Sequence, residues 1–124
     1  REPTLPMLGE LAAFLAEANC SHLYLDVGTN IGVQIRKLYE PHLYGQAHTL
    51  LTLFSQLFGD APRCHVCAVG VEPNPRHEKR LAVLTTRLRR AGAPVLILNA
   101  AAGTYNGQVP FMIPPRADKY EDWG

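Results

Sequence analysis

Three apolar runs, each closed by a glycine or a glutamate, constrain the fold of this chain more than any other feature. They cover residues 22–27 (HLYLDV), 65–72 (HVCAVGVE) and 95–103 (VLILNAAAG). The second run is apolar almost throughout, which is typical of a strand covered on both faces in a parallel sheet. The first run alternates, and we expect Leu23, Leu25 and Val27 to face inward. Apolar residues at helical spacing between the runs predict helices near 31–40 and 75–91, so the fold class is expected to be α/β, a doubly wound sheet with helices on both faces.

The remaining segments add helices and a turn around this sheet. An amphipathic pattern at residues 5–18 predicts an opening helix, and residues 42–58 predict a helical insertion before the second strand. The dipeptide Asn106-Gly107 predicts a short hairpin after the third strand. We therefore divide the chain into an N-terminal helix at residues 1–21 and one partial sheet domain at residues 22–124.

Composition narrows the classes of partner. The 12 Lys and Arg residues nearly balance the 11 Asp and Glu residues, so the charge does not favour a nucleic acid. The longest apolar runs fall well below the ~18 residues of a membrane span, and no span is expected. A neutral partner or a small ligand fits this composition better.

Cysteine usage gives an expectation about redox state. Cys20, Cys64 and Cys67 are an odd and sparse set that does not resemble a disulfide framework. We therefore expect reduced thiols and a reducing compartment such as the cytoplasm. Cys64 and Cys67 stand three residues apart on an expected strand, where they would point to opposite faces and could not easily hold one metal ion, so no metal site is predicted.

The turn after the first strand, DVGTNIG at residues 26–32, is the first candidate site, because ligands of doubly wound sheets bind beyond the carboxyl ends of the strands. Gly28 permits a sharp turn, Gly32 permits close approach by a helix or a ligand, and free amides at the helix start favour a negative group. Asp26 adds a carboxylate that suits a cation such as an amine. The turn is therefore expected to hold a zwitterionic ligand end, although the same G-x-x-x-G pattern also occurs in turns that bind nothing.

Glu72, at the end of the second strand, is the second candidate site. An acid at this position accepts both hydroxyls of a ribose in dinucleotide-binding folds, where it lies ~20 residues after the glycines. Here it lies 40 residues after Gly32, and the insertion at 42–58 accounts for the difference. Taken alone, Glu72 is better explained as a solvated carboxylate at a strand end. Its place on the neighbouring strand favours a nucleoside pocket, and the small residues of NAAAG at 99–103 would leave room for a flat ring.

Three stretches in this order, YLDVGTNIG, VGVEPNP and LNAAAGTYNGQVPF, resemble the FkbM-type family of S-adenosylmethionine-dependent methyltransferases. The similarity spans about residues 22–114, and its most specific part is EPNP at 72–75 followed by AAG at 101–103. The resemblance implies a Rossmann-like methyltransferase sheet, of which this chain carries the first half: three parallel strands and the short hairpin. It also implies S-adenosyl-L-methionine as the cofactor and O-methylation of a sugar or small-molecule hydroxyl as the reaction.

The resemblance also implies a set of cofactor contacts, all of which follow directly after a strand. The positions are Asp26, Gly28 and Asn30 for the methionine end, Glu72 for the ribose, Pro73, Asn74 and Ala101 for the adenine, and Thr29, Gly32 and Ala100 as neighbours in the same motifs. Thr29 stands where the family commonly has alanine. No residue is assigned as a catalytic base.

The chain departs from the family most clearly in extent. Family members continue with further strands, including an Asp-x-Glu-Gly-like motif after the fourth, which residues 1–124 do not contain. We expect the sequence to be a fragment or the first part of a larger protein, whose C-terminal segment completes the sheet and supplies the side that binds a small-molecule or glycan acceptor.

Two other functions share parts of this pattern. An NAD(P)-dependent oxidoreductase also uses a diol-binding acid, but the turn lacks the middle glycine of G-x-G-x-x-G that lets a pyrophosphate approach closely. The other alternative is a non-catalytic partial Rossmann module that binds a partner through its insertion helix.

Overall fold

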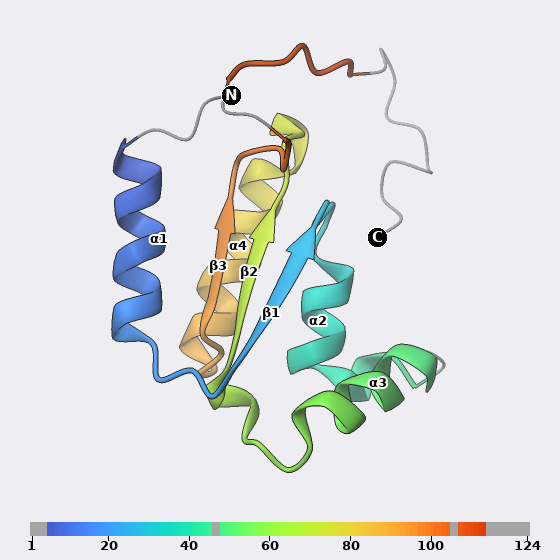
Figure 1. Ribbon diagram of the computed structural model, residues 1–124. Helices are drawn as coiled ribbons and strands as arrows, with labels where there is room; N and C mark the ends of the chain where they lie inside the picture. The colour runs from blue at the N-terminus through green and yellow to red at the C-terminus, as the bar shows by residue number, and fades with distance from the viewer. Residues whose placement is uncertain (1–4, 46–47, 105–106, 114–124) are drawn as a thin grey trace.

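The computed structural model describes residues 5–45, 48–104 and 107–113. Its centre is a sheet of three parallel strands, β1 (His22–Val27), β2 (Val66–Val71) and β3 (Val95–Leu98), in the order β1-β2-β3 (Figure 1). The middle strand β2 contains the near-continuous apolar run. It pairs with a strand on each side, and its residues are buried on both faces of the sheet. The predicted α/β class with three parallel strands is confirmed.

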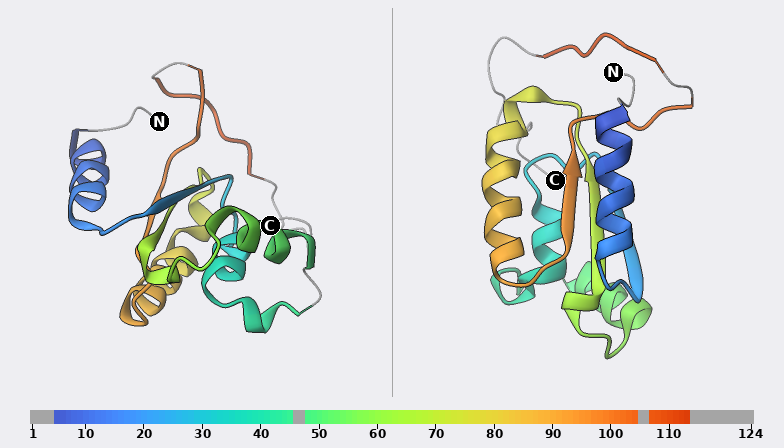
Figure 2. Two further views of the ribbon diagram at one scale, coloured as in Figure 1. Left: turned by 60° about the horizontal axis from the view of Figure 1, so that its bottom comes forward. Right: turned by 90° about the vertical axis from the view of Figure 1, so that its left-hand side faces the viewer.

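Helices lie on both faces of this sheet. They are α1 (Leu5–Glu17), α2 (Val33–Tyr39), α3 (His48–Phe58) and α4 (Glu78–Arg90), with short 3-10 turns η1 (Pro41–Leu43), η2 (Arg63–His65) and η3 (Pro75–His77). The right-hand view of Figure 2 shows β3 between α1 on one side and α4 on the other, with α2 on the side of α4. The expected helices are therefore present, and the insertion before β2 contains α3.

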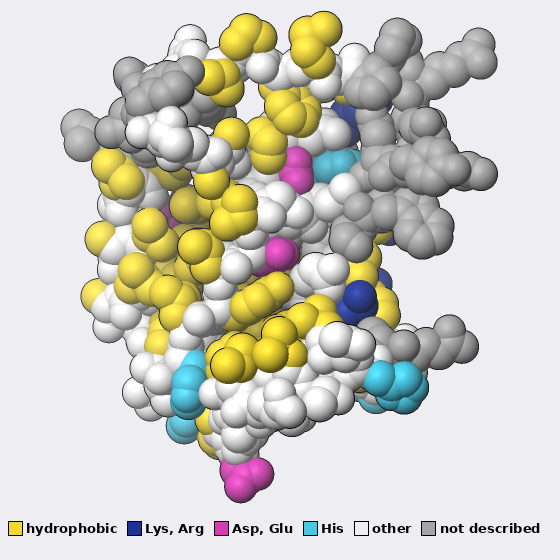
Figure 3. Space-filling view, turned by 45° about the vertical axis from the view of Figure 1, so that its right-hand side comes forward, with side chains coloured by type: hydrophobic (Ala, Val, Ile, Leu, Met, Phe, Trp, Pro, Cys, Tyr) yellow, Lys and Arg dark blue, Asp and Glu magenta, His cyan; other side chains and the backbone are white. Residues whose placement is uncertain are grey.

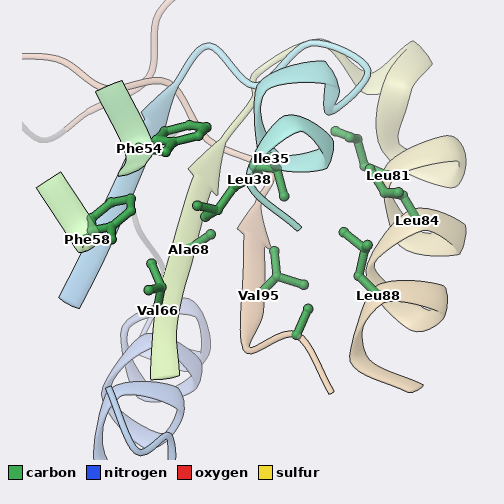
Figure 4. Close-up of a cluster of buried hydrophobic side chains, with 11 residues drawn as sticks. Ile35, Leu38, Phe54, Phe58, Val66, Ala68, Leu81, Leu84, Leu88 and Val95 are labelled. Atoms are coloured by element: carbon green, nitrogen blue, oxygen red, sulfur yellow. The ribbon is translucent and has the colours of Figure 1, made fainter. Parts of the chain in front are cut away.

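The main hydrophobic core lies between the sheet and helices α2, α3 and α4. Figure 4 shows aliphatic side chains of α2 and α4 and the two phenylalanines of α3 directed toward Val66 and Ala68 of β2 and Val95 of β3. Strand β1 joins this core through Tyr24, whose ring packs edge-on against Phe54 with centroids 5.2 Å apart. The helical insertion therefore closes one end of the core.

The predicted direction of the β1 side chains is wrong. Leu23, Leu25 and Val27 are exposed, while the alternate residues of β1 face the helices. Along the register row that joins Leu25, Val69 and Leu96, the exposed fraction falls from 58% to 5% to 2%. Helix α1 contacts β3 on this face and leaves the side chains of β1, at the opposite edge of the sheet, exposed. Figure 3 shows hydrophobic side chains gathered over this side of the molecule.

The expectation of three reduced thiols is also wrong. Cys20, in the link between α1 and β1, forms a disulfide with Cys67 of β2, with their Cα atoms 5.5 Å apart. The parallel register aligns His22 with Val66, and this brings the residues just before β1 alongside the start of β2. Cys64 is an exposed free thiol. Disulfides persist in oxidising surroundings, so the basis for predicting a reducing compartment no longer holds.

The segment after β3 differs from the expectation as well. The strand ends at Leu98, and residues 107–113 contain no strand where the second arm of a hairpin was predicted. Pro110 has no backbone donor and disfavours a paired strand there. Asn106, in the predicted turn, lies outside the described residues. Within the described ranges, no helix combines the length and the apolar character needed to cross a membrane.

Candidate functional site

The carboxyl ends of β1 and β2 are joined by the turn that the glycine motif forms. The backbone N–H groups of Gly28 and Thr29 both donate to the carbonyl oxygen of Val71, at 3.0 and 3.1 Å. The next amide, Asn30 N–H, donates to Oε1 of Glu72 at 2.7 Å. These hydrogen bonds hold the turn after β1 against the end of β2, so the two predicted sites form a single site.

Glu72 is buried at the centre of this site. Its Oε1 accepts from Asn30, and its Oε2 accepts from the backbone N–H of Asn74 at 2.8 Å. Each carboxylate oxygen can accept two hydrogen bonds. The two bonds to the backbone therefore fix the direction of the carboxylate and leave one acceptor position on each oxygen.

The amides of the glycine turn are not among the free donors expected at the start of the following helix, which begins at Val33. The N–H groups of Gly28, Thr29 and Asn30 are used as described, and Gly32 N–H donates to the carbonyl oxygen of Thr29 at 2.9 Å. These four donors stabilise the turn itself. The site is consequently dominated by carboxylates, which favours a cationic ligand group.

A different structural requirement explains the residue type at each position of the turn. Gly28 and Gly32 have φ values of 79° and 87°, which favour glycine. A Cβ at Gly32 would collide with Leu84 of α4, whereas a Cβ at Gly28 would meet nothing within 4 Å. Gly32 therefore serves helix packing, and the surface above Gly28 is open. Thr29 is 1% exposed and its hydroxyl donates to the carbonyl oxygen of Asp26, so its side chain belongs to the interior.

Asp26 is the unusual group of the site. It is 7% exposed, and its Oδ2 has no hydrogen-bond partner among the described residues. Burial raises the pKa of Asp26 above its usual value; a hydrogen bond from Thr29 opposes this rise, and the nearby charge of Glu72 adds to it. A buried carboxylate oxygen without a donor costs free energy, and a ligand that brings a donor and a positive charge would recover it.

Sequence reasoning did not assign two buried or half-buried side chains to this site. Burial, with the charge of Asp26, raises the pKa of Tyr24 to about 12. The second side chain is that of His77, which is buried beside Asn74. The alternation of β1, which places residues 24 and 26 on the same face, was a signal for Tyr24. The spacing of His77 four residues before Leu81 placed it on the apolar face of the following helix, but nothing in the sequence linked it to this site.

The remaining predicted contacts lie at the rim of the site. Pro73 and Ala100 are half-buried and Ala101 is exposed. The backbone N–H groups of Glu72 and Ala100 both donate to the carbonyl oxygen of Leu98, at 3.0 Å each, so the end of β3 lies next to the Glu72 motif. In the part of the chain that the structure describes, no three His, Cys, Asp or Glu residues form a group that could hold a metal ion.

Comparison of the chain with protein-family models, with curated proteins and with solved structures finds no match.

Proposed function

We propose that this chain binds S-adenosyl-L-methionine at the carboxyl ends of β1 and β2 and belongs to a methyltransferase that acts on a hydroxyl of a sugar or another small molecule. One observation carries the proposal: the buried Oδ2 of Asp26, which has no partner among the described residues, lies in one site with Glu72, whose direction is fixed and whose two oxygens each keep one acceptor position. A ligand with a cationic end and a neighbouring diol matches both groups. S-adenosylmethionine has both features and supplies an electrophilic methyl group on its sulfonium.

Each residue of the site has a separate part in this proposal. Asp26 attracts the cationic amine and accepts a hydrogen bond from it. This bond offsets the free-energy cost of burying the Asp26 carboxylate. Glu72 accepts the two ribose hydroxyls while its backbone bonds hold it in place. Gly28 leaves open surface beside them. Pro73, Asn74, Ala100 and Ala101 border the place for the adenine. In direct methyl transfer the protein mainly aligns the acceptor and excludes water, and we assign no catalytic base.

The site suits a dinucleotide less well. A pyrophosphate needs backbone donors, and the amides of Gly28, Thr29, Asn30 and Gly32 already donate within the protein. The two carboxylates would repel its charge. An NAD(P)-dependent oxidoreductase is therefore not favoured.

The exposed stripe on β1 favours a second candidate, a non-catalytic module that acts by binding another polypeptide. Leu23, Leu25 and Val27 are exposed on one face of an edge strand, and no described element covers them. In a methyltransferase, we propose that the same stripe is covered by the segment that completes the sheet and provides the acceptor side. The two candidates share this surface and differ in whether the Asp26 site binds a cofactor.

Calorimetric titration with S-adenosylmethionine, S-adenosylhomocysteine and NAD tests the proposal. We expect saturable binding of the first two ligands and none of NAD. Asp26→Asn and Glu72→Gln should each weaken binding about tenfold or more, because each removes a charge-assisted hydrogen bond. Asp60→Asn, at an exposed position after α3, is the matched control and should bind as the wild type does.

Two results would contradict the proposal. Equal binding by the wild type and by both site variants would remove the carboxylates from the ligand site. Failure of the folded wild type to bind either sulfur-containing ligand would leave the polypeptide-binding module as the better account.

A further inference from the structure

His77 is a buried titratable side chain to which the proposed function gives no role. It is the last residue of η3, directly precedes α4 and is 6% exposed. Its Nε2 atom lies 3.4 Å from Nδ2 of Asn74. The ring is therefore separated from the Glu72 carboxylate by a single residue of the EPNP motif.

The orientation of the Asn74 amide defines what the imidazole does. Asn74 Oδ1 accepts a hydrogen bond from the backbone N–H of Arg76 at 3.0 Å, so the amide NH₂ group is the part that faces His77. An NH₂ group can donate but not accept. Nε2 of His77 is consequently the acceptor, and the ring proton lies on Nδ1. His77 thus holds the Asn74 side chain by accepting a hydrogen bond from its amide.

Hydrogen bonds continue from Asn74 to the glycine turn. The backbone N–H of Asn74 donates to Glu72 Oε2 at 2.8 Å, and Glu72 Oε1 accepts from the backbone N–H of Asn30 at 2.7 Å. Glu72, Asn74 and His77 are each less than 8% exposed. Loss of one bond in such an enclosed network leaves a buried polar group unsatisfied, and the effect passes to its neighbours.

We infer that His77 is a positioning residue for the Glu72 carboxylate, an inference that rests on the proposed binding of S-adenosylmethionine. The imidazole fixes the Asn74 side chain, and this keeps the backbone N–H of residue 74 on one oxygen of Glu72. The glycine turn holds the other oxygen. His77 thus acts on a ribose diol through two intervening residues and without touching the ligand.

Two substitutions separate this role from simple packing. His77→Leu keeps an apolar side chain and removes the acceptor, whereas His77→Gln keeps an acceptor oxygen at about the reach of Nε2. In titrations with S-adenosylhomocysteine, we expect the Kd to rise about tenfold in His77→Leu and to return to within about threefold of the wild type in His77→Gln. Thermal unfolding of each chain shows that binding is measured on folded protein.

Nitrogen-15 NMR of the ligand-free wild type gives a measurement that does not depend on cofactor binding. The side-chain signals that are absent from the His77→Gln spectrum belong to His77, and they report which ring nitrogen carries the proton. We expect a protonated Nδ1 and a bare Nε2.

Each outcome bears on a different part of the inference. A proton on Nε2, unchanged affinity in His77→Leu, or equally weak binding in both variants would overturn the positioning role. A wild-type chain with the expected ring state that binds no S-adenosylhomocysteine would overturn the proposed function and leave His77 as a structural residue.

Discussion

Reduction of the Cys20–Cys67 disulfide should destabilise the fold by a predictable amount. The bond joins residues 47 apart in the sequence. In the chain-entropy model, closing a loop of this length removes about 14 cal/mol/K from the unfolded chain, which is about 4 kcal/mol at 25 °C. With a urea slope of about 2 kcal/mol/M, the unfolding midpoint should fall by roughly 2 M on reduction.

Urea titrations of one protein with and without reductant, followed by circular dichroism, measure this difference directly. A Cys64→Ser background removes the exposed free thiol and prevents exchange. A Cys20→Ala/Cys67→Ala variant should show no response to the reductant and serves as the control. If this background contains no free thiol before reduction and two after, yet the two midpoints coincide, the entropic reasoning is refuted. Two free thiols before reduction would refute the pairing itself.

Three further predictions concern single side chains. Gly32→Ala should lower the free energy of unfolding by about 3 kcal/mol and Gly28→Ala by about 1 kcal/mol. Both positions have positive φ, but only a Cβ at residue 32 would collide with a side chain of α4. Equal losses in urea titrations would contradict this difference. Asp26→Asn should be more stable than the wild type at neutral pH, because burial raises the pKa of Asp26 and disfavours its charged form. This gain should disappear in acid, where Asp26 is protonated. Thermal melts across pH measure the difference. Burial alone would raise the pKa of Glu40, but hydrogen bonds from Arg87 and Arg36 lower it below its usual value. Glu40→Gln should therefore cost about 1 kcal/mol near pH 7. This cost should shrink as the pH falls below the usual glutamate pKa and vanish below the lowered pKa of Glu40; a cost that persists in stronger acid would show that the ion pairs are not its source.

The order of elements could be predicted because each one has its own local pattern. The uninterrupted apolar run of β2 marks a central strand, and the Asn74-Pro75 pair marks a helix start, which the structure realises as η3 leading into α4. The side chain of Asn74 accepts from the backbone N–H of Arg76, as expected of a cap. These features depend on a few neighbouring residues and need no knowledge of the tertiary fold.

The errors arose where distant segments decide the outcome. Alternation along β1 defines two sets of side chains, but the position of α1 over β3 decides which set is covered. The Cys20–Cys67 bond depends on the register between two strands. The hydrogen bonds that hold the glycine turn could not be predicted, because their acceptors, Val71 and Glu72, lie more than 40 residues further along the chain. In each case the local sequence permitted more than one result.

The position of β1 at the edge of the sheet has a consequence for hydrogen exchange. In a parallel pair, the N–H groups of alternate residues point toward the neighbouring strand, and those between them point away from it. With β2 on one side and no described strand on the other, β1 should show alternating slow and fast exchange, whereas the middle strand β2 should be protected at every residue. Any polypeptide that pairs with the open side of β1 would slow the fast set, and the exchange pattern of six residues would then report the completion of the sheet.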